Sequence, residues 1–291
     1  MAHRKQALQQ QVTVIVAVLV LSSSLVTQVP LQAQSLAKES PTLIAQSVVD
    51  RLRWLFFPPK TANRGAPSGR KKGGATQGIC PPVNKPLTAL VPTNKADSTA
   101  EEIPMGVTAS AHPTFWFYVP YAAKSRRLAE FVLIDQDEAD VFLTTFTLTA
   151  APGIIGVQVP EKMPPLQVGK QYRWVFSVIC DPSNRSGDVT VNGWIQRVAL
   201  GSAVQDQLKQ TTLPGERFAL YAQNGVWYEA LTTLANLRFT DSSDRVIQDW
   251  QTILDSAELN ELRAEPITTP NILRSVKPTQ YPKPDWILRP I

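Results

Sequence analysis

The sequence predicts an α+β fold, in which an antiparallel Ig-like β-sandwich over residues 111–198 precedes a small helical subdomain over residues 199–266. Short runs rich in β-branched and aromatic residues recur between turn signals across the first region, which is typical of a sandwich. After Val198 the hydrophobic period changes from two residues to about 3.6, the period of a helix. Hydrophobic residues make up 43% of the 291-residue chain, enough for one large domain or two small ones.

Six strands are predicted in the sandwich. They cover residues 115–119, 128–135, 140–148, 154–159, 172–180 and 188–198. The fifth run alternates clearly, so Trp174, Phe176 and Cys180 share one face and Arg173 lies on the other. Cys180 therefore belongs to an aromatic face that we expect to be buried. Gly193, inside the sixth run, is expected to mark a bulge.

The helical region begins with a helix over residues 200–209. Further helices are indicated by Pro214 as a first-turn residue, by the stripe of Trp227, Leu231, Leu234 and Leu237, and by Ser243 as a cap. Asp255 and Glu258 have the spacing of a capping box, which predicts a last short helix ending before Pro266. Residues 267–291 form a Pro-rich tail that we expect to be irregular.

The N-terminal 33 residues have the pattern of a secretory signal peptide. Arg4 and Lys5 form a basic start, residues 12–21 are apolar over the length of such a peptide's core, and Ala33 suits cleavage. An uncleaved membrane anchor over residues 12–29 is the alternative, because this stretch is long enough but interrupted by polar residues. We therefore expect an exported protein, periplasmic or extracellular, with membrane anchoring as the second reading.

Residues 34–110 are expected to form a Pro/Gly-rich basic linker. The stretch from Arg51 to Lys72 carries seven basic residues and no acid, so a solvated linker or contact with an anionic membrane or wall polymer would fit it. Within it, residues 47–57 could form a short amphipathic helix that packs locally or docks elsewhere. Loss of the leader lowers the formal net charge from +5 to about +3, which does not favour nucleic-acid binding.

Cys80 and Cys180 are the only cysteines in the sequence. An even count in an exported chain predicts one disulfide, and two free thiols are the alternative. No second pair of ligands lies near either cysteine in the sequence, so a metal site at these residues is not expected.

Catalytic motifs are scarce. Serine or cysteine hydrolases of the usual kind need a histidine base, and only His3 and His112 occur, of which His3 lies in the leader. His112 precedes Pro113 and is expected in an exposed loop. We find no phosphate-binding glycine loop, and no cofactor is predicted.

Two groups of residues remain as binding candidates. Asp135, Asp137 and Asp140 are candidate calcium ligands, although a solvated hairpin explains the same acidic cluster. Trp116, Tyr118 and Trp194 could form a surface on which sugars stack, although aromatic residues at strand period usually belong to a core. Residues 115–118 are aromatic on both faces of their strand, so one face must meet either the helical region or a ligand or partner.

Several stretches together resemble a family of exported cyanobacterial proteins that is known only as domain of unknown function nine-two-eight. The stretches are residues 113–121, 129–133, 152–154, 168–174, 179–182, 193–197 and 225–231, and the likeness runs from about Cys80 to Pro266. The turn at residues 137–140 departs from the Gly-containing turn expected there. The resemblance implies export and a shared fold, and it supplies no catalytic residues.

The sequence therefore favours an exported, non-catalytic module that binds or structures the cell envelope through a protein or glycan partner. The alternative is a carboxylate-dependent hydrolase acting on envelope or extracellular polysaccharide, whose paired acids would have to come from separate strands. A pair of facing acids in a cleft would favour the enzyme, and an exposed aromatic patch would favour binding.

Overall fold

A computed structural model describes residues 69–73, 80–94, 103–121, 127–148 and 152–269. These residues all belong to one compact unit of the chain. The expected signal peptide, the expected helix at residues 47–57 and most of the Pro-rich tail lie outside the described residues. Within the described ranges, no helix combines the length and hydrophobicity that a membrane crossing requires.

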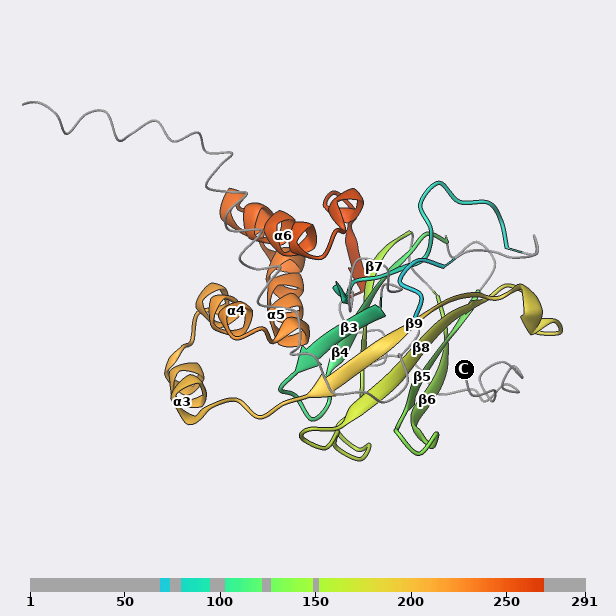
Figure 1. The fold of residues 1–291 in the computed structure, drawn as a ribbon. Helices are drawn as coiled ribbons and strands as arrows, with labels where there is room; N and C mark the ends of the chain where they lie inside the picture. The colour runs from blue at the N-terminus through green and yellow to red at the C-terminus, as the bar shows by residue number, and fades with distance from the viewer. Residues whose placement is uncertain (1–68, 74–79, 95–102, 122–126, 149–151, 270–291) are drawn as a thin grey trace, which may run out of the picture. The chain divides into compact units, whose positions relative to one another are not determined.

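The structure is a mixed α and β fold with two sheets of mostly antiparallel strands (Figure 1). The strands are β1 (Thr88–Ala89), β2 (Thr93–Asn94), β3 (Ile103–Thr108), β4 (Thr114–Val119), β5 (Leu128–Ile134), β6 (Asp140–Thr147), β7 (Gly153–Gln158), β8 (Gln171–Ile179), β9 (Val189–Arg197) and β10 (Ile267–Thr269). One sheet has the order β1-β4-β7-β10 and the other β2-β3-β9-β8-β5-β6. All six strands expected between residues 115 and 198 are confirmed.

The two sheets pack face to face through aromatic side chains. Phe117 on β4 stacks on Phe176 on β8, with ring centroids 4.2 Å apart. Phe115 approaches Phe131 on β5 at 4.8 Å in a tilted arrangement. These rings belong to one main core that also contains helical residues. The expected separate helical subdomain and Ig-like arrangement stay predictions, because helices and sheets share this core.

The described helices are α3 (Ser202–Gln210), α4 (Pro214–Gln223), α5 (Trp227–Thr240) and α6 (Asp244–Ser256). Helix α5 packs against β3, β4 and β10 and so covers the second face of the four-stranded sheet. There Trp116 Nε1 donates a hydrogen bond to Thr232 Oγ1 at 2.9 Å. The aromatic residues on both faces of β4 are thus explained, because one face meets the other sheet and the opposite face meets α5.

The stretch expected to be linker contains strands in its described part. Strands β1, β2 and β3 all lie before residue 111, and β3 pairs in parallel with β9. Strand β10 also pairs in parallel with β7, at the start of the tail that we expected to be irregular. The sheets are therefore mostly antiparallel, as expected, and the parallel pairs come from β3 and β10, which lie outside residues 111–198.

Two local expectations are also wrong. The capping box at Asp255 and Glu258 opens no α-helix. Asp255 belongs to the last turn of α6, Glu258 has a left-handed φ of 56°, and a 3-10 turn (Asn260–Leu262) follows. Gly193 marks no bulge, since the β8–β9 register is continuous through it. A Cβ atom there would lie 2.4 Å from Trp174, so this glycine makes room for the indole ring.

Candidate functional site

A polar cavity of about 180 Å³ lies where the β3–β4 loop meets α4 and α5. Its lining comes from that loop, from the paired strands β4 and β7 and from both helices. The lining residues are Ser110, His112, Pro113, Thr114, Gln158, Arg217, Tyr221, Glu229, Thr232 and Thr233. Thr114 and Gln158 face each other across the β4–β7 ladder. The site is therefore assembled from residues 110–114, Gln158 and the consecutive helices α4 and α5.

Glu229 lies in the first turn of α5 and is held by the end of β3 and the loop that follows. Its Oε1 atom accepts hydrogen bonds from Thr108 Oγ1 at 2.5 Å and from Ser110 N–H at 3.1 Å. Its Oε2 atom accepts from Ala109 N–H at 3.0 Å. Burial raises the pKa of Glu229, although each of these hydrogen bonds opposes the shift. This carboxylate ties the start of α5 to the sheet and forms one wall of the cavity.

Arg217 and Tyr221, one turn apart on α4, also line the cavity. Arg217 Nη1 donates to the carbonyl oxygens of Leu208 and Thr211, at 2.6 and 3.2 Å. Its Nη2 atom donates to the Tyr221 hydroxyl at 3.2 Å, and its guanidinium carbon lies 5.8 Å from that ring's centroid. Because two carbonyl groups bind Nη1, the guanidinium is oriented before any ligand arrives. Arg217 Nε makes no hydrogen bond within the described residues.

His112 is half-buried rather than exposed as the sequence predicted. Its Nε2 atom lies 2.9 Å from the Met163 carbonyl oxygen, and its backbone N–H donates to Ser110 Oγ at 3.0 Å. A carbonyl oxygen can only accept, so Nε2 carries the proton and Nδ1 of the neutral ring is an acceptor. The Ser110 hydroxyl keeps its own proton for another partner. The β3–β4 loop thus supplies one acceptor, His112 Nδ1, and one donor, the Ser110 hydroxyl.

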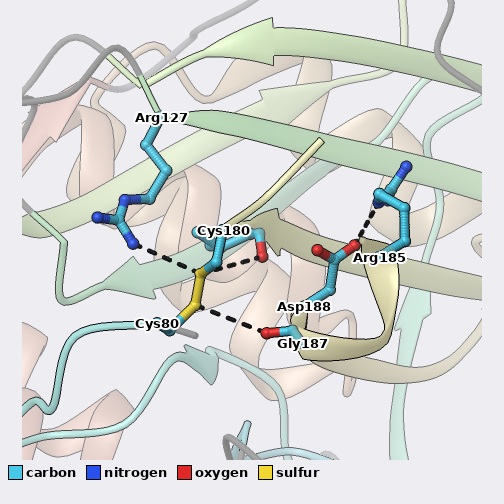
Figure 2. The surroundings of a disulfide bond; sticks show 7 residues. Cys80, Arg127, Cys180, Arg185, Gly187 and Asp188 are labelled. Atoms are coloured by element: carbon cyan, nitrogen blue, oxygen red, sulfur yellow. Dashed lines mark hydrogen bonds and ion pairs between the residues drawn. A yellow bond between two sulfur atoms is a disulfide. The ribbon is translucent and has the colours of Figure 1, made fainter. Parts of the chain in front are cut away.

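A second buried polar cluster surrounds the disulfide (Figure 2). Cys80 and Cys180 are joined with their Cα atoms 5.3 Å apart, and the described part of the chain has no free cysteine. The expected pairing is present in the structure. Arg127 Nη1 points toward Cys180 Sγ at 3.5 Å, and the Arg127 guanidinium also lies over the Tyr121 ring. The bridge ties residue 80 onto the end of β8.

Arg185 holds two buried carboxylates next to that bridge. Its Nη2 atom lies 2.9 Å from Glu130 Oε1 and its Nε atom 2.5 Å from Asp188 Oδ2 (Figure 2 shows the second pair). Glu130 is only 1% exposed, on the face of β5 that is turned away from the other sheet. Burial raises the pKa of Asp188 while Arg185 opposes the shift. Both carboxylates share one cation, so this cluster is a structural ion-pair network.

The three aromatic residues proposed as a sugar-stacking surface do not form one. Trp116 and Tyr118 are 2% and 6% exposed, and Trp116 lies under α5. Trp194 is half-buried on the six-stranded sheet, opposite Arg173 in the β8–β9 register. The expectation of a shared exposed surface is therefore wrong, because the rings lie in different layers.

The candidate calcium ligands lie in the β5–β6 hairpin. Asp135 Oδ1 accepts the backbone N–H groups of Asp137 and Ala139, each at 2.9 Å, and so closes the turn. Asp137 and Asp140 are exposed. In the part of the chain that the structure describes, no group of three or more His, Cys, Asp or Glu side chains could hold a metal ion.

The end of the basic stretch Arg51–Lys72 is engaged within the protein. The Lys71 ammonium donates to the Ala257 carbonyl oxygen at the end of α6, and Lys72 Nζ lies 2.5 Å from Glu261 Oε1. Lys85 likewise pairs with Glu265. Lys71 and Lys72 therefore contact the C-terminal part of the same chain. Residues 51–68 of the basic stretch lie outside the described residues.

Sequence reasoning missed the cavity residues on α4 and α5. Arg217, Tyr221 and Glu229 belong to no motif, and their spacing along two different helices carries no recognisable chemistry. The one available signal was the acid in the first turn of a predicted helix, a common and usually structural position. Only the packing of α5 on β3 and β4 brings these residues to His112 and Ser110.

Comparison with known proteins gives a family but no activity. No curated protein and no solved structure matches the chain. The model of the family described as Domain of Unknown Function (DUF928) matches residues 72–267, which include both sheets, the four described helices and both cysteines. The chain therefore belongs to the DUF928 family.

Proposed function

We propose that this protein is an exported, non-catalytic module that binds a neutral sugar ring of an envelope glycan in the cavity between the β3–β4 loop, α4 and α5. One observation carries the proposal: nearly every side chain that lines the cavity is polar, and several keep hydrogen-bonding capacity that no other described residue uses. Arg217 Nε and the hydroxyl protons of Ser110 and Tyr221 are donors, and His112 Nδ1 is an acceptor.

A sugar matches this set because each of its hydroxyl groups both donates and accepts. The volume of about 180 Å³ is well below that of a typical drug-sized site, so it suits one ring rather than a chain of rings. The lining contains one cation, Arg217, and one carboxylate, Glu229, so it has no strong preference for a charged ligand. A neutral sugar at the end or side of a polymer is therefore the ligand class we favour.

Export is supported by the predicted leader and by the disulfide. A bridge between Cys80 and Cys180 persists in an oxidising compartment, such as the periplasm or the extracellular space. A partner in the envelope follows from that location. The retention of the N-terminal segment as an anchor is the alternative form of the same proposal.

A hydrolase receives less support from the same site. A glycosidase needs two carboxyl groups on either side of the scissile bond, and the cavity lining contains Glu229 alone. Both Glu229 oxygens already accept hydrogen bonds from the protein. The other buried pair of acids, Glu130 and Asp188, is bound by the Arg185 guanidinium. We therefore favour binding without turnover.

The test is a binding titration of the protein starting near Gln34 against a panel of neutral and acidic envelope sugars. Thr233→Val removes a hydroxyl from the cavity wall, and Thr240→Val removes one from an exposed position of the same helix. We expect a neutral sugar to bind, with its Kd raised about tenfold by Thr233→Val, the worth of one hydrogen bond. Thr240→Val should leave the Kd unchanged.

Equal binding by both variants would place the sugar elsewhere, and binding of no sugar by the folded protein would refute the proposal. Release of reducing ends during incubation with a polysaccharide would instead favour the hydrolase. Circular dichroism of each variant ensures that a lost signal does not come from lost folding.

A further inference from the structure

Helix α3 is attached to the rest of the fold by few side chains. In Figure 1 it lies beside α4 and apart from both sheets. Leu208 is its one buried residue, and Val204 is half-buried. The other seven residues of the helix are exposed. A short helix with one buried side chain has little apolar area to hold it in place, so any further contact matters for its docking.

Arg217 on α4 supplies a further contact. Its Nη1 atom donates to the carbonyl oxygens of Leu208 and Thr211 at the C-terminal end of α3, at 2.6 and 3.2 Å. Carbonyl groups in the last turn of a helix have no partner within the helix and carry partial negative charge, so a guanidinium is a favourable partner there. Among the described residues, no other side chain from outside α3 hydrogen-bonds to this helix.

The same guanidinium lies at the cavity. Its Nη2 atom donates to the Tyr221 hydroxyl at 3.2 Å, and both side chains line the cavity. A planar guanidinium that is held at two of its nitrogen atoms cannot turn freely. The direction in which the Nε–H group of Arg217 points therefore depends on where the end of α3 lies.

Helix α4 is held independently of α3. The backbone N–H groups of Glu216 and Arg217 donate to the Leu213 carbonyl oxygen in its first turn. Phe218 and Ala222 are the buried residues of α4, which packs against α5. Undocking of α3 would therefore leave α4 in place and would change the orientation of Arg217 rather than remove the cavity.

We infer that Leu208 is a positioning residue for the cavity and that it acts through Arg217. Its side chain is the buried part of α3, and its carbonyl group accepts the shorter hydrogen bond from Arg217. Docked α3 thus fixes Arg217 for a ligand, and a bound ligand in turn favours the docked helix, because coupling between two equilibria is reciprocal. The effect on ligand affinity rests on the proposed function, whereas the effect on Arg217 does not.

Nuclear magnetic resonance tests the positioning without any sugar. The Nε–H resonance of Arg217, assigned by its loss in Arg217→Lys, should broaden or move toward that of a free arginine side chain in Leu208→Ser. The amides of α3 should then exchange hydrogen about tenfold faster, while those of α5 keep their wild-type rates. Leu208→Met keeps a buried apolar side chain and should preserve both signals. Gln207→Ser, at an exposed residue of the same helix, is the matched control.

A titration with the neutral sugar that the cavity binds measures the coupling. The Kd should rise about tenfold in Leu208→Ser. It should stay at the wild-type value in Leu208→Met and Gln207→Ser. Saturating sugar should also slow hydrogen exchange of the α3 amides in the wild-type protein and leave that of the α6 amides unchanged.

An unchanged Arg217 resonance in Leu208→Ser would overturn the inference, whether or not α3 exchanges faster. Equal loss of protection in α3 and α5 would also overturn it, because Leu208 would then support the whole helical layer. A changed resonance with an unchanged Kd would contradict the coupling to the ligand. Binding of no sugar by the folded wild-type protein would refute the proposed function alone, since the comparison of the Leu208 variants by magnetic resonance still decides the positioning role.

Discussion

The carboxylates of Glu130 and Glu229 are both buried, yet the protein stabilises them with different partners. Glu130 pairs with the Arg185 guanidinium at 2.9 Å, and Arg185 also holds Asp188. Glu229 pairs with no cation among the described residues: two backbone N–H groups and the Thr108 hydroxyl bind it beside an open cavity. The first carboxylate is sealed into a network, and the second remains next to space that a ligand can enter.

This difference distinguishes a buried charge that stabilises the fold from a buried charge that lines a cavity open to a ligand. An ion pair without access to solvent serves the fold, and removal of one partner leaves the other unpaired at high cost. A carboxylate held by neutral donors at a cavity wall costs less to alter and keeps its surroundings polar. We therefore place the structural anchor of the protein at the disulfide and its ion-pair network, and the proposed ligand site at the α4–α5 cavity.

The largest expected effect comes from the disulfide next to the Glu130 network. Cys80→Ser combined with Cys180→Ser opens a loop of 100 residues and should lower the free energy of unfolding by about 4 kcal/mol. Urea denaturation of the oxidised, reduced and double-variant proteins measures it. A double variant as stable as the oxidised protein would show that the ion pairs of Arg185, without the disulfide, stabilise this part of the fold.

Glu130→Gln should have the next largest effect, about 3 kcal/mol, because Arg185 loses one of its two buried carboxylate partners. Asp206→Asn is the matched control, since Asp206 and its partner Lys209 are both exposed, with side-chain exposures of 61% and 73%, and this change should matter by less than about 1 kcal/mol. Chemical denaturation of both variants compares them. Equal losses would contradict the structural role that we assign to Glu130.

Glu229→Gln should cost about 1–2 kcal/mol, less than Glu130→Gln. The amide retains one oxygen acceptor, but its NH₂ group would face a backbone N–H donor or the Thr108 hydroxyl. Glu216→Gln, exposed on α4, is the control. If Glu229→Gln destabilised the protein more than Glu130→Gln, the contrast between the two carboxylates would be reversed.

The smallest effect is a pH dependence at Glu229. Because burial raises its pKa above the ordinary value of 4.5, the folded state binds more protons than the unfolded state just above that pH. The contribution of Glu229 to stability should therefore fall as pH rises from 4.5 through the raised pKa. The difference in unfolding free energy between wild type and Glu229→Gln, followed from pH 4 to 7, measures this slope. A difference that grows with pH would mean that the hydrogen bonds outweigh burial.

The sequence by itself determined the secondary structure of residues 114–256 to a large extent. Strand runs such as residues 172–180 alternate strictly, and helix signals such as Pro214 and Ser243 lie where α4 and α6 begin. These signals are local, since they depend on side-chain periodicity and on backbone preferences at the ends of elements. The disulfide partners could also be named, because only two cysteines exist.

Only the tertiary structure decided which faces are buried and where the cavity lies. The short strand β3 carries no clear alternation and becomes a strand by pairing with β9. Trp116 could have faced solvent or a helix, and the packing of α5 buries it. Glu229 and His112 are separated by more than a hundred residues, so no local pattern relates them. Contacts of this range depend on how the layers stack, and periodicity along one chain does not encode that.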